Sequence, residues 1–190
     1  MIEIISEKIE KNSTMIIEKL IKNNSVNDYL NILKLFNEDE IIGGKFQKAF
    51  NNFYGLNRFM NSKECFYAIF DDCKKSNSFD LVKILIELQK STGRIEYSFV
   101  SKMCHTIDNN LPIYDNNIAK TFGFGIHNNS DMEIKISRFL LFLKELEHHY
   151  SSIVANNLLE KSLKQFDENF PSIQISLTKK IDFIIWTYGS

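Results

Sequence analysis

The sequence has no excess of charge of either sign. Lysine and arginine number 23 and aspartate and glutamate 24, a formal net charge of −1 over 190 residues. Proteins that hold nucleic acid by nonspecific electrostatics usually have a marked basic surplus. Arginine is also scarce, and only Arg58, Arg94 and Arg138 offer bidentate contacts to phosphate or guanine. Any DNA contact must therefore come from a few lysines arranged in space, and weak binding with a steep salt dependence is expected.

Cysteine pairs and targeting signals are missing as well. Cys65, Cys73 and Cys104 are odd in number and form no C-x-x-C pair, so neither a disulfide framework nor a zinc knuckle is expected. The N-terminus has acidic residues where a secretory signal would have positive charge. Charges interrupt every apolar stretch before it reaches the length of a membrane span. These absences predict a cytoplasmic protein that does not enter the membrane.

Strict alternation of apolar and polar residues, the pattern of a β-strand, is nearly absent outside the neighbourhood of Gln174. Apolar residues recur instead at helical spacing, which predicts an all-α, compact multi-helix fold. At this length, with 44% hydrophobic residues, we expect one domain over residues 1–190, with a helical segment at 1–24 and the core at 25–190. No repeat of fixed period argues for a solenoid.

Helix starts and ends can be placed from local signals. A break is expected near Asn12, starts at Ser25, Ser62 and Ser130, and an end at Gly93. The expected helices cover about 2–22, in one or two pieces, then 25–35, about a dozen residues after Gly44, 62–73, 78–92, 97–107, a short one from 115, a long one from 130, and 151–166 and 176–187.

One segment carries a recognisable motif. An apolar helix over 97–107 leads through a short loop to Leu111-Pro112-Ile113-Tyr114-Asp115, with Ile118 following. This run resembles the helix-hairpin-helix DNA glycosylase superfamily, the α-helical base-excision repair enzymes. In that family a Pro, one or two apolar residues and an Asp open the helix after the hairpin. The resemblance covers roughly residues 90–125, and beyond them only the number and approximate length of the helices.

The resemblance implies that Asp115 is the key carboxylate of a DNA glycosylase-like protein acting on a damaged base in double-stranded DNA, with no metal and no cofactor. Cleavage of an N-glycosidic bond develops positive charge on the sugar, and a nearby carboxylate stabilises that charge or deprotonates the attacking water. The alternative interpretation is that Asp115 only caps the helix that contains Ile118. The two roles do not exclude each other.

The sequence departs from the family pattern at two places. The hairpin of the family usually carries two glycines whose amides bind a DNA phosphate, whereas this chain has only Gly93 in Ser91-Thr92-Gly93-Arg94-Ile95. Bifunctional members have a nucleophilic lysine about nineteen residues before the Asp. Here that position is Glu96, which cannot form a Schiff base. The resemblance therefore implies a monofunctional enzyme, if the protein is an enzyme.

A polar stripe precedes the motif. Ser98, Ser101, Lys102 and His105 are spaced i, i+3, i+4 and i+7, so they share one face of the expected helix. This face could line a substrate cleft, with Lys102 contacting phosphate or base and His105 transferring a proton. The alternatives are a solvated helix face, or small serines that allow close packing.

The extruded base would need aromatic neighbours, and the nearest in sequence include Tyr97 and Tyr114. Glu145 and His149 have a spacing that can hold a metal, but no second ligand pair is evident, and a solvated helix end is the simpler interpretation. Two other hypotheses stay open for the whole chain. It can be a non-enzymatic module of the same fold that binds nucleic acid or protein, or an unrelated helical domain whose motif matches by chance.

Overall fold

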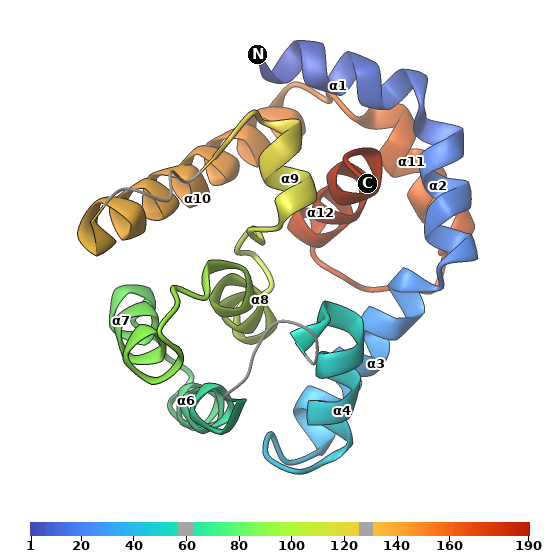
Figure 1. The fold of residues 1–190 in the computed structure, drawn as a ribbon. Helices are drawn as coiled ribbons and strands as arrows, with labels where there is room; N and C mark the ends of the chain where they lie inside the picture. Colours follow the sequence, from blue (N-terminus) through green and yellow to red (C-terminus); the bar gives the residue numbers. More distant parts are fainter. Residues whose placement is uncertain (57–62, 126–130) are drawn as a thin grey trace. The chain divides into compact units, whose positions relative to one another are not determined.

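A computed structural model describes residues 1–56, 63–125 and 131–190. Across these ranges the chain forms eleven helices and no strand, which confirms the all-α prediction (Figure 1). No helix in them is both long enough and apolar enough to cross a membrane. Ser62 and Ser130, the expected helix starts, and Arg58 lie outside the described residues.

The helices group into two compact units, each described by itself. Unit one comprises residues 1–23 and 109–190, and unit two comprises residues 24–108. The helical segment expected at 1–24 corresponds to the first two helices, which group with the C-terminal part of the chain. Unit one contains α1 (Ile2–Lys11), α2 (Ser13–Lys22), α9 (Asn116–Thr121), α10 (Met132–Ala155), α11 (Glu160–Asn169) and α12 (Leu177–Tyr188). Unit two contains α3 (Ser25–Glu38), α4 (Lys45–Tyr54), α6 (Lys63–Ser76), α7 (Leu81–Thr92) and α8 (Tyr97–Ile107).

The last helix organises unit one. In Figure 1 α12 lies among α1, α2, α9 and α11, and it contacts all four. Its start is capped by Ser176, whose Oγ accepts a hydrogen bond from the Lys179 amide at 3.1 Å. At its end, a Cβ on Gly189 would overlap the Asn117 carbonyl and lie 2.7 Å from Thr121 Oγ1. The glycine thus permits α12 to pack closely against α9, the helix that follows the Pro-to-Asp motif.

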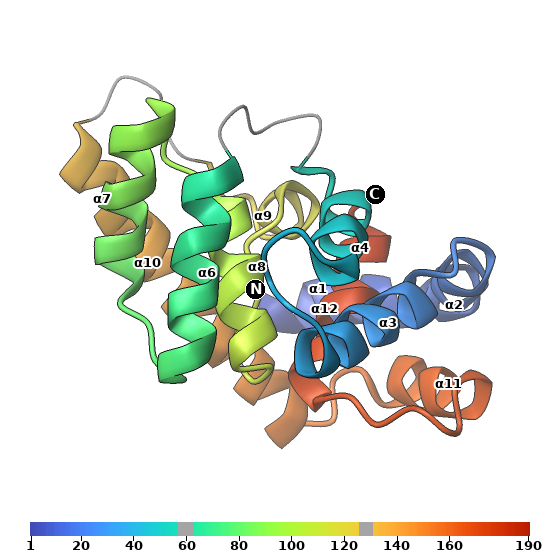
Figure 2. The ribbon, with the colours of Figure 1, turned by 90° about the horizontal axis from the view of Figure 1, so that it is seen from below.

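Aromatic side chains build the interior of unit two. The rings of Phe46, Phe50 and Phe70 form a triangle with centroids 5.4–5.5 Å apart, and all three are fully buried. Tilted and edge-on geometries of this kind add to the free energy gained from burying aromatic surface. Figure 2 shows α6, α7 and α8 side by side, in agreement with their contacts.

Most element predictions are confirmed, with two corrections. The break at Asn12, the helix over 97–107 and the end at Gly93, which has φ +73°, are as expected. The helix expected at 151–166 is wrong, because α10 continues to Ala155 and the chain turns at Asn157 with φ +52°. Ser25, the expected capping residue, is instead the first residue of α3, and the N-cap is Asn24, in the left-handed conformation.

Candidate functional site

Asp115 lies at the N-terminus of α9. Its Oδ1 accepts a hydrogen bond from the Asn117 amide at 3.0 Å, and its backbone is extended with φ −141°. The structure therefore confirms that Asp115 caps α9. The side chain is half-buried, so the carboxylate is fixed in one orientation at a helix end, where the helix dipole stabilises negative charge.

The neighbouring Tyr114 belongs to an aromatic group in unit one. Its ring is edge-on to Phe139, Phe142 and Phe124, with centroids 5.5, 5.8 and 6.2 Å away. Burial, and to a smaller extent the charge of Asp115, raises the pKa of the Tyr114 hydroxyl. This hydroxyl therefore stays protonated at neutral pH, in the electrostatic field of the Asp115 carboxylate.

A second carboxyl group, which the sequence analysis did not single out, is buried in the same unit. Asp182 of α12 is 2% exposed, and its Oδ1 accepts a hydrogen bond from the Tyr150 hydroxyl of α10 at 2.6 Å. Lys179, one turn earlier on α12, is 4% exposed and has its ammonium 4.7 Å from the centre of the Phe183 ring. Three ionisable side chains thus lie in the interior of unit one.

Burial raises the pKa of Asp182 from its ordinary 3.8 to about 6. The charge of Lys179 and the hydrogen bonds from Tyr150 and the Ile113 amide lower it, whereas the charge of Asp115 raises it further. The contribution of Asp115 is the smallest of these, and burial is the largest.

A sequence signal for this cluster exists. Asp182 interrupts the apolar run Ile181-Asp182-Phe183-Ile184-Ile185, in which every residue is buried. A carboxylate inside such a run has no exposed face of the helix to occupy, and buried ionisable groups are rare unless they are paired. Tyr150, in contrast, sits in the ordinary pattern of α10 and carries no signal of its own.

The polar stripe predicted on α8 lies in unit two, and it is buried. Lys102 is 7% exposed, and its Nζ donates a hydrogen bond to Ser98 Oγ at 2.8 Å. The same ammonium lies 5.3 Å from the Tyr54 ring centre and 5.7 Å from that of Phe99, within the range of cation–π attraction. The solvated-face alternative is therefore wrong.

His105, the last member of the stripe, is fully buried. Its Nε2 shares a hydrogen bond of 2.9 Å with the Tyr29 hydroxyl of α3. Ser101 Oγ donates to the Ser98 carbonyl at 3.0 Å, so the polar atoms of the stripe are partly satisfied within the helix itself. Tyr97, at the start of α8, is half-buried.

The two departures from the family pattern have defined structural roles. Gly93 is the C-cap of α7, and its amide donates to the Gln89 carbonyl at 2.8 Å, so it serves the helix end. Glu96 is the N-cap residue of α8, and burial raises the pKa of its half-buried carboxyl group. Neither residue supplies a nucleophilic amine.

The possible metal-binding pair was Glu145 and His149, and in the structure His149 packs against an aromatic ring. His149 stacks on the Phe122 ring with centroids 5.1 Å apart and an interplanar angle of 4°. Burial and the neighbouring His148 lower the pKa of His149. Within residues 1–56, 63–125 and 131–190, no group of three or more His, Cys, Asp or Glu side chains is placed to hold a metal ion.

The six predicted site residues thus fall into two sets. Asp115 and Tyr114 belong to unit one, while Tyr97, Ser98, Lys102 and His105 belong to unit two. Within the second set, Lys102 and Ser98 are in direct contact. Comparison with protein-family models, with curated proteins and with solved structures found no match. The candidate site therefore rests on the residues of this chain.

Proposed function

We propose that the protein is a divergent, monofunctional DNA glycosylase-like hydrolase that releases a damaged base from double-stranded DNA, with Asp115 as its key carboxylate. The observation that carries the proposal is the fixed position of this carboxylate. Asp115 is the last residue of the Leu111–Asp115 motif, and its carboxylate is held at the N-terminus of α9 by the Asn117 amide. A preorganised negative group is what a reaction with a developing cation requires.

The proposed reaction breaks the bond between the sugar C1′ and the base nitrogen, and the bonding electron pair leaves with the base. Asp115 stabilises the positive charge that develops on the sugar and accepts a proton from the water whose oxygen then bonds to C1′. The departing base takes up a proton in turn. Because Glu96 stands where bifunctional members have lysine, no Schiff base forms and the sugar–phosphate backbone stays intact.

Of the other predicted site residues, Tyr114 belongs to the same unit as Asp115 and provides a ring for the extruded base. Lys102 and His105 are buried in unit two and hydrogen-bonded there to Ser98 and Tyr29, so we assign them to the packing of that unit. Action in base-excision repair within the cytoplasm is part of the same proposal.

The test is base release from a panel of duplexes, each with one lesion, comparing the wild type with Asp115→Asn. Asparagine caps a helix about as well as aspartate, so this substitution removes the charge and keeps the cap. Asp80→Asn is the matched control, since Asp80 caps α7 in the same way, accepting from the Lys83 amide at 3.0 Å. We expect release by the wild type and by Asp80→Asn, and a loss of at least about a hundredfold in Asp115→Asn.

A second candidate is a non-enzymatic module that binds nucleic acid or a protein partner. It is favoured by one observation: the Gly93 amide, the remaining glycine amide of the hairpin region, is already bonded within α7. The same panel separates the candidates. Duplex retention without base release would support the module and overturn the enzyme. If neither release nor retention occurs for any duplex, both DNA-directed proposals fail.

A further inference from the structure

Unit one contains a pocket that Asp115 does not line. It lies between α10, the start of α12 and the loop before α9, and it has a volume of about 460 Å³. Small-molecule sites in proteins usually fall between 300 and 1,000 Å³. Tyr150 lines the pocket, and its side chain is anchored from behind by the buried Asp182.

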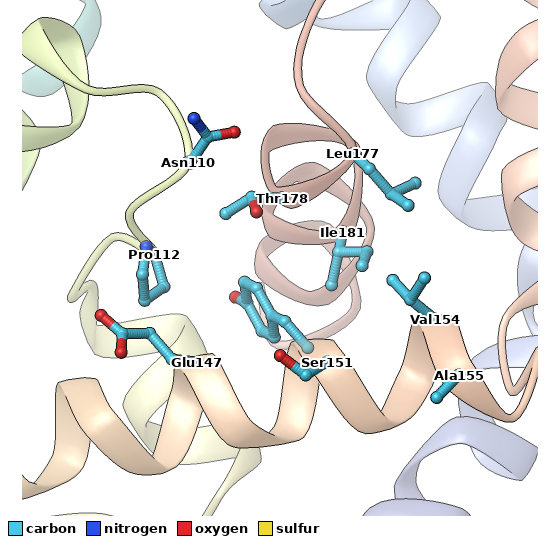
Figure 3. Close-up of a pocket in the computed structure, with 10 residues that line it drawn as sticks. Asn110, Pro112, Glu147, Ser151, Val154, Ala155, Leu177, Thr178 and Ile181 are labelled. Atoms are coloured by element: carbon cyan, nitrogen blue, oxygen red, sulfur yellow. The ribbon is translucent and has the colours of Figure 1, made fainter.

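The two ends of the pocket differ in chemistry. Figure 3 shows Glu147 beside Pro112 at one end, and Leu177, Val154 and Ala155 at the other. Leu177 is 41% exposed and Val154 is 44% exposed, so both leave aliphatic surface open to the hollow. A ligand with an apolar body would cover this surface and gain free energy from doing so.

Three polar residues of the pocket are available to a ligand. Glu147, Ser151 and Thr178 line it, and none of their side chains has a hydrogen bond or ion pair with any residue in the described ranges. Glu147 is the only lining residue that carries a formal charge at neutral pH, and no lysine or arginine lines the pocket. The charge of the pocket is thus complementary to a cation.

We propose that this pocket binds a small amphiphilic organic cation, an amine on a flat or compact apolar body. The ammonium group pairs with the Glu147 carboxylate and donates hydrogen bonds to the hydroxyl oxygens nearby, while the apolar body contacts Leu177, Val154 and Ala155. Tyr150 adds a ring whose position is fixed by its bond to Asp182. The site is independent of any action on DNA, so it stands whatever the outcome for Asp115.

The test is a titration of the full chain, followed by two-dimensional amide NMR, with three probes of one size. Tryptamine is the cation, tryptophol its neutral counterpart and indole-3-acetate the anion. We expect saturable shifts at Ser151 and Thr178 with tryptamine, and a Kd at least about threefold lower than for tryptophol at low salt. Indole-3-acetate should bind more weakly than either.

Two variants and one control variant locate the binding site. Glu147→Gln should abolish the preference for tryptamine over tryptophol, whereas Glu145→Gln, which removes an exposed charge from the same helix outside the pocket, should retain it. Ala155→Trp should weaken all three probes by filling the apolar end. The proposal is overturned if tryptamine gives no saturable shifts, if all three probes bind equally, or if Glu147→Gln keeps the preference.

Discussion

The carboxylate of Glu10 caps a helix that begins 150 residues later in the chain. Its Oε1 accepts hydrogen bonds from the amide and the hydroxyl of Ser162 at 2.9 and 2.5 Å, and its Oε2 accepts one from the Lys161 amide at 3.0 Å. The N-terminus of α11, which has no side-chain cap from Leu159, is thus satisfied by α1. This contact links the two chain segments that make up unit one.

Glu10→Ala should therefore destabilise the protein. The substitution leaves the Lys161 and Ser162 amides without their acceptor, and a lost helix cap costs about 0.5–2 kcal/mol. Denaturant unfolding followed by circular dichroism measures the change. Glu7→Ala is the matched control, because Glu7 is exposed on the same helix, and it should change the free energy of unfolding by less than about 0.5 kcal/mol. Equal effects of the two substitutions would contradict the capping role.

The buried Asp182 predicts a particular pH dependence of stability. Its pKa is raised to about 6 in the folded protein, against about 3.8 for the ordinary carboxyl group, so the folded state holds this proton more tightly than the unfolded state. The folded state is therefore favoured below pH 4, and this contribution is lost as the pH rises from about 4 to above 6. Asparagine cannot ionise, so the Asp182→Asn variant lacks this pH-dependent contribution to stability.

The measurement is the difference in free energy of unfolding between the wild type and Asp182→Asn from pH 4 to pH 7.5. We expect the wild type to lose stability relative to the variant as the pH rises through this window. Other groups titrate in both proteins and cancel in the difference. A flat difference, or one that rises with pH, would show that Asp182 keeps an ordinary or lowered pKa.

Much of the fold could be predicted because its signals are local. The helix over 97–107, the cap at Asp115 and the end at Gly93 each depend on residues within one helical turn. The end of α10 could not be predicted from apolar spacing, since the spacing continues past Ala155 and only the conformation of Asn157 ends the pattern. Glu10 as the cap of α11 depends on a pairing that no local pattern contains.

The candidate site also combines features that the local sequence predicts with features that depend on residues distant in the chain. Asp115 was found because a Pro-to-Asp motif is contiguous. The spacing of Ser98, Lys102 and His105 was consistent with one polar face, but polarity alone does not distinguish a solvated face from a buried one. Each of these side chains has a partner in the structure, such as Tyr29 for His105, which permits burial at little cost. That partner is 76 residues away in the chain.

A second capping contact, in unit two, depends on a glycine. Asp39 Oδ2 accepts a hydrogen bond from the Phe46 amide at 2.9 Å and so caps α4, while a Cβ on Gly44 would lie 2.5 Å from the same oxygen. Gly44→Ala should therefore displace the Asp39 carboxylate and cost about 1 kcal/mol or more in unfolding free energy. Gly125→Ala, where a Cβ would meet open space, is the control and should be nearly neutral.

Asp39→Ala should cost a similar amount, because it removes the same cap. The double substitution should then cost clearly less than the sum of the two, since the cap can be lost only once. A double-mutant cycle measured by denaturant unfolding checks this. Additive effects would show that Gly44 acts on α4 independently of Asp39.

The bond between Tyr29 and His105 yields a prediction that concerns both stability and the proposed chemistry. Both side chains are fully buried, so Tyr29→Phe removes a buried hydrogen bond between α3 and α8 and should cost about 1–3 kcal/mol in unfolding free energy. Tyr188→Phe, at a half-buried position near the C-terminus, is the control and should be close to neutral.

The pH profile of base release should be the same in the wild type and in Tyr29→Phe, because His105 is fully buried in unit two and is not exposed to a substrate. The profile is measured on the lesion that the wild type processes, at a temperature where the variant remains folded. A shifted profile would show that His105 takes part in the reaction.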